Sequence, residues 1–116
     1  MDKKWRGGAT INFNYLVGWP FASLTVNSEN LILKIPRFIL PIFGGTYRFK
    51  REQVSRISVF RVIILYETGI QIHHNVSSYP KEITFRFWNG KRKEILSELA
   101  KCGYNIDTTS KDRIRL

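Results

Sequence analysis

The fold class of this chain is decided by Glu82-Ile83-Thr84-Phe85-Arg86-Phe87-Trp88, a stretch whose alternating pattern is typical of a half-buried β-strand. The strand leads through Asn89-Gly90 into one amphipathic helix, which we expect Asn89 to cap and Gly103 to end. This helix carries a single apolar stripe made of Ile95, Leu96, Leu99 and Cys102. One stripe packs on one surface, so strands followed by a single helix predict a small β-barrel that the helix closes at one end.

Alternating apolar positions predict six further strands upstream, at residues 11–17, 21–26, 31–35, 46–50, 54–60 and 69–75. In the first of these, Ile11, Phe13, Tyr15 and Val17 share one face. The strand 54–60 is expected to contain a bulge, because its apolar positions do not keep a strict period of two. The polar turn 27–30 joins the second and third of these strands in a hairpin. Residues 36–45 are predicted as a loop or a bulged edge rather than a central strand, since Pro36 and Pro41 cannot donate hydrogen bonds to a sheet.

The predicted architecture is therefore mainly β, with seven antiparallel strands and one C-terminal helix in a single domain of residues 9–106. Residues 1–8 are expected to form a flexible N-terminus and residues 107–116 a flexible tail. Cys102 is the only cysteine, which excludes an intramolecular disulfide and suits a buried thiol in a reducing compartment. No apolar stretch has the length of a membrane-spanning helix or the character of a signal peptide. These features predict a cytoplasmic protein, either free or peripheral to the inner face of the membrane.

Several segments carry a resemblance to a known family: Trp19-Pro20-Phe21-Ala22-Ser23-Leu24-Thr25-Val26, Gly69-Ile70-Gln71-Ile72-His73-His74-Asn75, Pro80, Ile83-Thr84-Phe85 and Cys102-Gly103-Tyr104. Over about residues 9–106 the chain resembles a family of small bacterial proteins with a pleckstrin-homology-like fold. The resemblance implies a strongly bent, seven-stranded antiparallel barrel closed by a C-terminal helix. It also implies a binding or scaffolding role, with no activity that can be named.

The resemblance transfers no lipid-binding residues to this chain. Pleckstrin-homology domains that bind phosphoinositides use basic residues on the first two strands of a hairpin, around its loop. The corresponding turn in this chain, residues 27–30, carries Glu29 and no base, and residues 21–26 contain neither Lys nor Arg. We therefore expect no specific recognition of inositol phosphates through that pocket.

Composition favours an anionic partner. Lys and Arg total 19 against 9 Asp and Glu, a formal net charge of +10. Such an excess suits an acidic lipid surface, an acidic protein surface or nucleic acid, and it also keeps a small aromatic-rich domain soluble. Nucleic acid is the weakest of these interpretations, because the aromatic residues that alternate with the bases of residues 46–50 point to the opposite face of their strand.

Two candidate sites follow from the region between residues 30 and 61, where Glu52 is the only acid. The candidate anion-binding residues are Lys34, Arg37, Arg48, Lys50 and Arg51. The candidate membrane or partner contact is the apolar loop, with Phe38, Ile39, Leu40, Ile42 and Phe43. If these two groups of residues lie together, they predict a peripheral membrane site. Its bases would contact acidic headgroups, and its apolar side chains would enter the boundary of the acyl chains. The alternatives are that the loop covers the barrel, binds a protein partner or joins two copies of the chain.

No constellation of residues points to catalysis, so we expect no enzyme, no cofactor, no metal and no small-molecule substrate. His73 and His74 are adjacent on a strand, face opposite sides and cannot converge on one ion. We expect His74 to be a core histidine bonded to backbone and His73 to lie on the surface. No two carboxylates have a spacing that suggests a paired acid and base.

Overall fold

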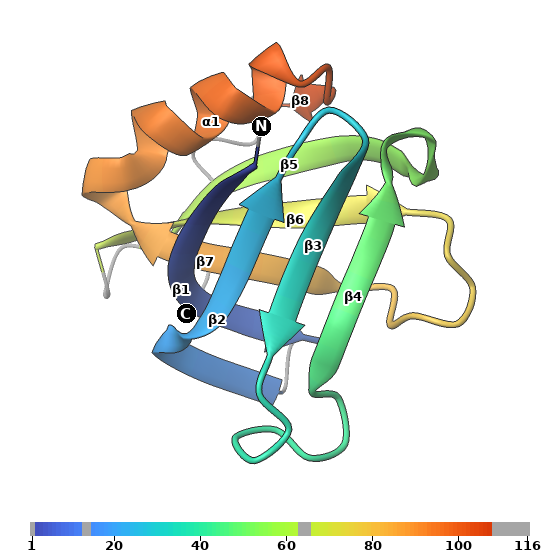
Figure 1. Cartoon of the computed structure of the whole chain (residues 1–116). Helices are drawn as coiled ribbons and strands as arrows, with labels where there is room; N and C mark the ends of the chain where they lie inside the picture. The colour runs from blue at the N-terminus through green and yellow to red at the C-terminus, as the bar shows by residue number, and fades with distance from the viewer. Residues whose placement is uncertain (1, 13–14, 63–65, 108–116) are drawn as a thin grey trace.

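The computed structural model describes residues 2–12, 15–62 and 66–107, which form one curled sheet and one α-helix (Figure 1). The strands are β1 (Lys3–Ile11), β2 (Tyr15–Val26), β3 (Asn30–Ile35), β4 (Gly45–Lys50), β5 (Val54–Val62), β6 (Glu67–His74), β7 (Ile83–Trp88) and β8 (Ile106–Asp107). Two short 3-10 turns, η1 (Arg51–Gln53) and η3 (Asn89–Lys91), precede β5 and the helix α1 (Arg92–Lys101). The predicted mainly-β class is confirmed, although the sheet has eight strands where seven were expected.

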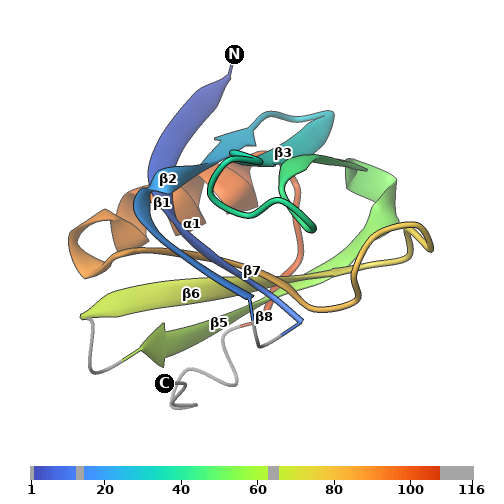
Figure 2. The same ribbon diagram turned by 90° about the horizontal axis from the view of Figure 1, so that it is seen from below.

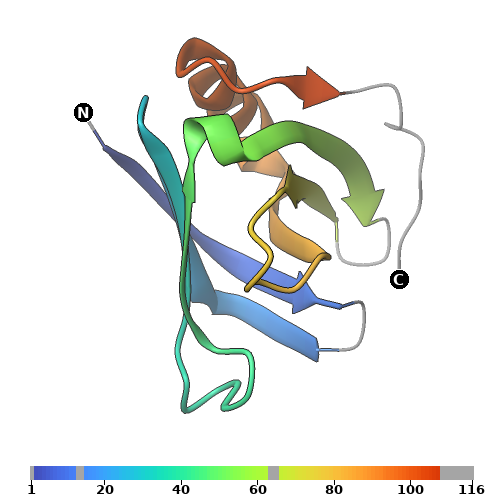
Figure 3. The same cartoon turned by 90° about the vertical axis from the view of Figure 1, so that its right-hand side faces the viewer.

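The sheet has the strand order β4-β3-β2-β1-β7-β6-β5-β8. Strands β1 to β4 form one antiparallel meander and β5 to β7 form another. The two meanders are joined where residues 8–11 of β1 pair with residues 83–86 of β7. Strand β8 adds to β5 in parallel. Seen from the side, the meanders face each other as the two walls of a half-barrel, with α1 at one end (Figure 3). The view from below shows the β1–β2 pair crossing from one wall to the other (Figure 2).

The core lies between the two walls, because each strand directs alternate apolar side chains inward. The pattern is regular in β3, where Leu31, Leu33 and Ile35 are buried, and in β4, where Tyr47 and Phe49 are buried. Strand β7 is more enclosed than its alternation predicts, since residues 83–87 are buried on both faces. The bulge predicted in the strand 54–60 is present in β5 as a register shift between Val54 and Arg56.

The N-terminal segment corrects two predictions. Residues 3–8 belong to β1, and residues 3–7 pair with β2, so the boundary predicted at residue 9 is wrong. The predicted strand 11–17 instead contains the end of β1, a reversal at Asn12 with φ of 51° and the beginning of β2, while Phe13 lies outside the described residues. Because the chain turns there, Tyr15 is exposed while Ile11 and Val17 are buried. The turn 27–30 joins β2 to β3, the second and third strands, as predicted.

The helix begins and ends by different means. Asn89 does not cap α1, because it opens η3 and its side-chain Oδ1 accepts a 2.6 Å hydrogen bond from the Thr68 hydroxyl. The predicted end at Gly103 is confirmed: this residue has φ of 91°, and the N–H groups of Gly103 and Tyr104 donate to the carbonyls of Ala100 and Leu99. Of the predicted tail, residue 107 lies in β8 and residues 108–116 lie outside the described part of the chain.

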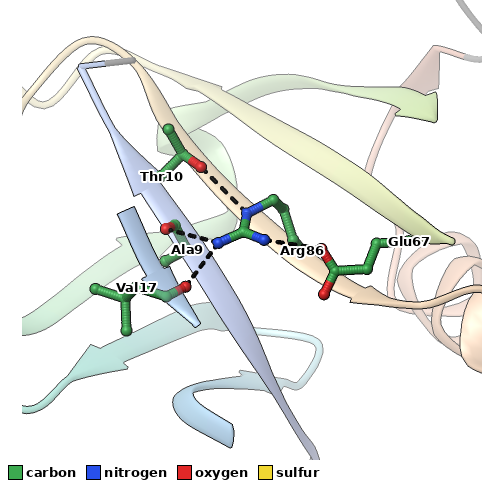
Figure 4. A network of polar contacts seen from close by, with 5 residues as sticks. All are labelled: Ala9, Thr10, Val17, Glu67 and Arg86. Carbon is green, nitrogen blue, oxygen red and sulfur yellow. Dashed lines mark hydrogen bonds and ion pairs between the residues drawn. The ribbon is translucent and has the colours of Figure 1, made fainter. Parts of the chain in front are cut away.

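A buried arginine joins four strands at the bend of the sheet (Figure 4). The Arg86 guanidinium on β7 donates to Val17 O at 2.7 Å, Thr10 Oγ1 at 3.2 Å and Ala9 O at 3.4 Å, and pairs with Glu67 at 2.8 Å. A glycine on β1 leaves the space for it, because a Cβ on Gly8 would stand 2.8 Å from Arg86 Nη2 and 2.5 Å from Val17 O. A buried charge is tolerated when it is paired and hydrogen-bonded, so Arg86 is a structural residue.

Candidate anion-binding surface

Cations line the outer face of the β1–β4 wall because the strand register places them there. Arg6, Ser23, Lys34 and Thr46 lie side by side across the four strands, and Lys4, Thr25, Ile32 and Arg48 form the next row. Side chains of directly paired residues are about 5 Å apart, so Arg6 and Lys34, two strands apart, come within reach of one ligand. In these two rows every charged residue is a cation.

A pocket of about 380 Å³ opens on this face, and we call it the cationic pocket. It is lined by Arg6, Phe21, Ser23, Lys34, Ile35, Pro36, Arg37, Gly45 and Thr46. Three side chains supply positive charge and two supply hydroxyl groups, while no acidic residue belongs to the lining. Guanidinium, ammonium and hydroxyl donors are the groups that bind phosphate and carboxylate oxygens in proteins.

The three cations of the pocket have few partners within the protein. Among the described residues, Arg6, Lys34 and Arg37 have no carboxylate at ion-pair distance, and the one hydrogen bond of Arg6 is a 3.5 Å contact to Pro20 O. Arg37 lies against Gly45 and close to the Tyr47 phenol. Burial raises the pKa of that phenol, and the Arg37 guanidinium acts in the opposite direction. The pocket thus presents donors that an incoming anion can satisfy.

The structure divides the five predicted anion-binding residues. Lys34 and Arg37 line the cationic pocket, and Arg48 lies exposed on the same face beyond it. Lys50 and Arg51 lie at the other end of β4, about 17 Å along the strand, in a separate hollow of about 310 Å³ that also contains Glu29 and Glu52. These two acids offset the two bases, so that hollow has no excess of positive charge.

The apolar loop 36–44 is a compact turn beside the pocket. Its backbone closes on itself, because Gly44 N–H donates to Leu40 O at 2.7 Å and Leu40 N–H to Pro36 O at 3.1 Å. Ile39, Leu40 and Phe43 pack partly against the core, whereas Phe38 and Ile42 are 80% and 77% exposed. The five candidate contact residues therefore split into three that anchor the loop and two that project from it.

Sequence reasoning missed Arg6, Ser23 and Thr46, which complete the pocket. Arg6 was assigned to a flexible segment, and the two hydroxyl residues carry no signal until the register brings them beside Lys34. The alternation of Lys4 and Arg6 with Trp5 and Gly7 is the pattern that could have revealed β1.

Other side chains with chemical potential have structural partners. His74 Nδ1 accepts from Val76 N–H at 3.0 Å and its Nε2 donates to Pro80 O at 2.9 Å, as expected for a histidine bonded to backbone. His73 is half-buried rather than on the surface, with its Nε2 2.7 Å from the Ser58 hydroxyl. Burial raises the pKa of the Cys102 thiol, which opposes thiolate formation.

Within the described ranges, no three His, Cys, Asp or Glu side chains are grouped so that they could hold a metal ion. None of the helices described has both the length and the apolar character needed to cross a bilayer. Comparison with protein-family models gives no match to this chain, and a search of curated proteins also finds none. Function must therefore be inferred from the surface itself.

Proposed function

We propose that this protein is a noncatalytic binding module that docks on an anionic membrane surface. In this proposal the cationic pocket holds the phosphate or carboxylate of a lipid headgroup, and Phe38 and Ile42 enter the boundary between headgroups and acyl chains. The observation that carries it is the position of three cations, without a carboxylate at ion-pair distance among the described residues, directly beside a loop with two projecting apolar side chains.

The chemistry of the two parts is complementary. Arg37 lines the pocket and is followed in the chain by Phe38, so charge and apolar surface are joined at one point of the loop. The ring of Tyr15, an exposed residue at the start of β2, lies 4.6 Å from that of Phe43. Tyr15 thus extends the apolar surface beside the loop. Proteins that attach peripherally combine such a basic patch with inserted apolar residues.

The free energies of binding favour charge combined with apolar insertion over charge alone. Three bases near an anionic surface contribute about 3 kcal/mol, which by itself corresponds to roughly millimolar affinity. Burying Phe38 and Ile42 adds about 1.5 to 3 kcal/mol each. The sum of about 6 to 9 kcal/mol lies in the micromolar range before the cost of association is subtracted. Affinity of this size requires the apolar loop.

We also propose that the curled sheet is a variant of the pleckstrin-homology-like fold. Support comes from the succession of a four-stranded meander, a three-stranded meander and a C-terminal helix packed on the open end. Strand β8 is then an addition after the helix. Binding sites on such a fold lie on its surface, in agreement with a module that has no catalytic role.

The test is cosedimentation with vesicles that contain phosphatidylserine, at low and at physiological salt, with neutral vesicles as the control. We expect binding that persists at physiological salt, because screening weakens exposed charges but not inserted apolar groups. Lys34→Glu with Arg37→Glu should weaken binding by at least about 30-fold, the equivalent of about 2 kcal/mol. Phe38→Ser with Ile42→Ser should leave only binding that salt abolishes.

Matched variants separate the site from net charge and general hydrophobicity. Lys93→Glu with Lys101→Glu changes the charge equally on the exposed side of α1, and Tyr66→Ser removes an exposed aromatic ring elsewhere. If the helix pair weakened binding as much as the pocket pair, only net charge would matter and the proposal would be wrong. The alternative is self-association through the loop. It would be favoured if vesicles did not bind and if the mass measured by sedimentation rose with protein concentration in the unmodified protein but not in Phe38→Ser.

A further inference from the structure

A second concave surface brings together all three tryptophans of the chain. Trp5, Trp19 and Trp88 line a cleft of about 610 Å³ together with Arg6, Glu67 and Lys91, and we call it the tryptophan cleft. Its residues come from β1, β2, β6, β7 and η3. A volume of this size is typical of sites for small organic ligands.

The position of each ring follows from a local feature of the backbone. Between the pairs Gly7↔Ala22 and Ala9↔Val17, four residues of β2 stand opposite Gly8 alone, and this bulge carries Trp19 out of the sheet. Trp88 ends β7 and lies against Gly90, where a Cβ would stand 2.9 Å from its ring. Trp5 is only 8% exposed, and its indole N–H donates to Glu94 Oε2 on α1 at 2.6 Å.

The rings divide into a buried floor and two exposed walls. Trp19 and Trp88 are 65% and 60% exposed, which is unusual for the largest aromatic side chain. Exposed aromatic side chains that line a concave surface are more often part of a binding site than of a surface that only faces solvent. The apolar part of a ligand can therefore pack on two aromatic faces, those of Trp19 and Trp88.

The charges of the cleft determine which ligand it suits. Glu67 is paired with the Arg86 guanidinium at 2.8 Å, so its charge is offset from within the protein. Arg6 and Lys91 have no carboxylate at ion-pair distance among the described residues, and their two charges outweigh that of Glu94, which accepts from the Trp5 indole at 2.6 Å, so the excess is positive. An ammonium ligand, which aromatic cages bind, would meet two cations here, whereas an anion would be attracted.

We propose that the tryptophan cleft binds a small amphiphilic anion, a compound with a flat apolar body and one carboxylate, sulfonate or phosphate group. The apolar body packs between Trp19 and Trp88, and the anionic group contacts Arg6 and Lys91. This proposal does not rest on membrane docking, because the ligand binds as a free molecule. The two surfaces meet at Arg6, which lines both the cleft and the cationic pocket.

The test uses three compounds that share the 2-naphthyl ring system and carry one negative, neutral or positive substituent: 2-naphthoate, 2-naphthalenemethanol and 2-naphthylmethylammonium. They are titrated into the ¹⁵N-labelled full chain, and binding is followed by the three indole N–H resonances, which all report on the cleft. We expect saturable shifts of the Trp19 and Trp88 resonances with the anion, at least about tenfold weaker binding of the alcohol, and none of the ammonium compound. Equal affinity for anion and alcohol, preference for the ammonium compound, or unshifted indole resonances would each overturn the proposal.

Variants assign the site and keep it distinct from membrane docking. Trp88→Ala and Arg6→Gln should each weaken naphthoate binding by about tenfold, while Arg6→Gln should leave binding of the alcohol unchanged. The matched controls Leu16→Ala and Lys101→Gln, at exposed positions outside the cleft, should change neither. Lys34→Glu should weaken vesicle binding and leave naphthoate affinity within about twofold, whereas Trp88→Ala should do the reverse. Loss of naphthoate binding in Leu16→Ala or Lys34→Glu would show that the site lies elsewhere.

Discussion

Replacing Arg86 by Met should destabilise the fold severely, because the guanidinium joins β7 to three other strands. The change removes four interactions and leaves Glu67 without its cation and the Val17 carbonyl without its 2.7 Å donor. The side chains of Arg86 and Glu67 are only 9% and 12% exposed, so water cannot fully replace these contacts. Removing one partner of a buried pair costs about 3 to 5 kcal/mol.

The assay is urea denaturation followed by circular dichroism, with a thermal melt as a second measure. For a domain of this size the loss corresponds to a decrease in Tm of roughly 12 to 20 °C. Arg56→Met, at an exposed position on β5, is the matched control and should stay within about 0.5 kcal/mol of the unmodified protein. Glu67→Gln should cost less than Arg86→Met, since the amide oxygen still accepts from the guanidinium. A loss below about 1 kcal/mol in Arg86→Met would refute the view that this residue holds the bend together.

Three further changes test other local features. Gly8→Ala should destabilise by about 1 to 3 kcal/mol because its Cβ would stand 2.5 Å from Val17 O, whereas Gly18→Ala, with no atom within 4 Å, should be tolerated in the same denaturation assay. Gly103→Ala should cost about 1 kcal/mol or more, measured in the same way, because its φ of 91° is unfavourable for a residue with a Cβ. Burial raises the pKa of Tyr104 to about 12 from its ordinary value of 10.0, so the protonated phenol favours the folded state. Its contribution to stability is complete below pH 10 and is lost as the pH rises toward 12. A titration of tyrosinate absorbance should show one phenol ionising near pH 12, and this step should disappear in Tyr104→Phe.

The regular strands could be predicted from the sequence because their inward positions repeat every second residue. Leu31, Leu33 and Ile35 alternate with residues that face solvent, as do Tyr47 and Phe49, and all five are buried. The same period is present in β1 but is hard to recognise, because Trp5 is the only large apolar residue among residues 2–8, is flanked by bases and is followed after Arg6 by two glycines. Without knowledge of the partner strand, a segment with this composition is indistinguishable from a flexible N-terminus. In the structure the glycines give the space that β7 needs at the bend.

The candidate site was only partly predictable, because proximity in the chain is a poor guide to proximity across a sheet. Lys34 and Arg37 are three residues apart and both line the cationic pocket. Lys50 and Arg51 belong to the same basic run, but the length of β4 carries them to the other end of the wall. Arg6 lies 28 positions before Lys34 and comes beside it only through the β1–β2 and β2–β3 registers. Such a neighbour can be found only once the pairing of the strands is known.

Two arginines at the same bulge show how stability and binding are separated in this fold. Arg86 is buried and uses four of its five N–H donors on the β1, β2 and β6 strands, so it is not accessible to a ligand. Arg6 is exposed, and its one hydrogen bond to another described residue, to Pro20 O, is 3.5 Å long. A guanidinium has five N–H donors. The Arg6 guanidinium lies at the rim of both concave surfaces, where its unsatisfied donors are available to an anion. The bulge beside which Arg86 lies also places Arg6 between the cationic pocket and the tryptophan cleft, so loss of the Arg6 charge should weaken binding of the proposed ligands without removing any contact that the fold requires.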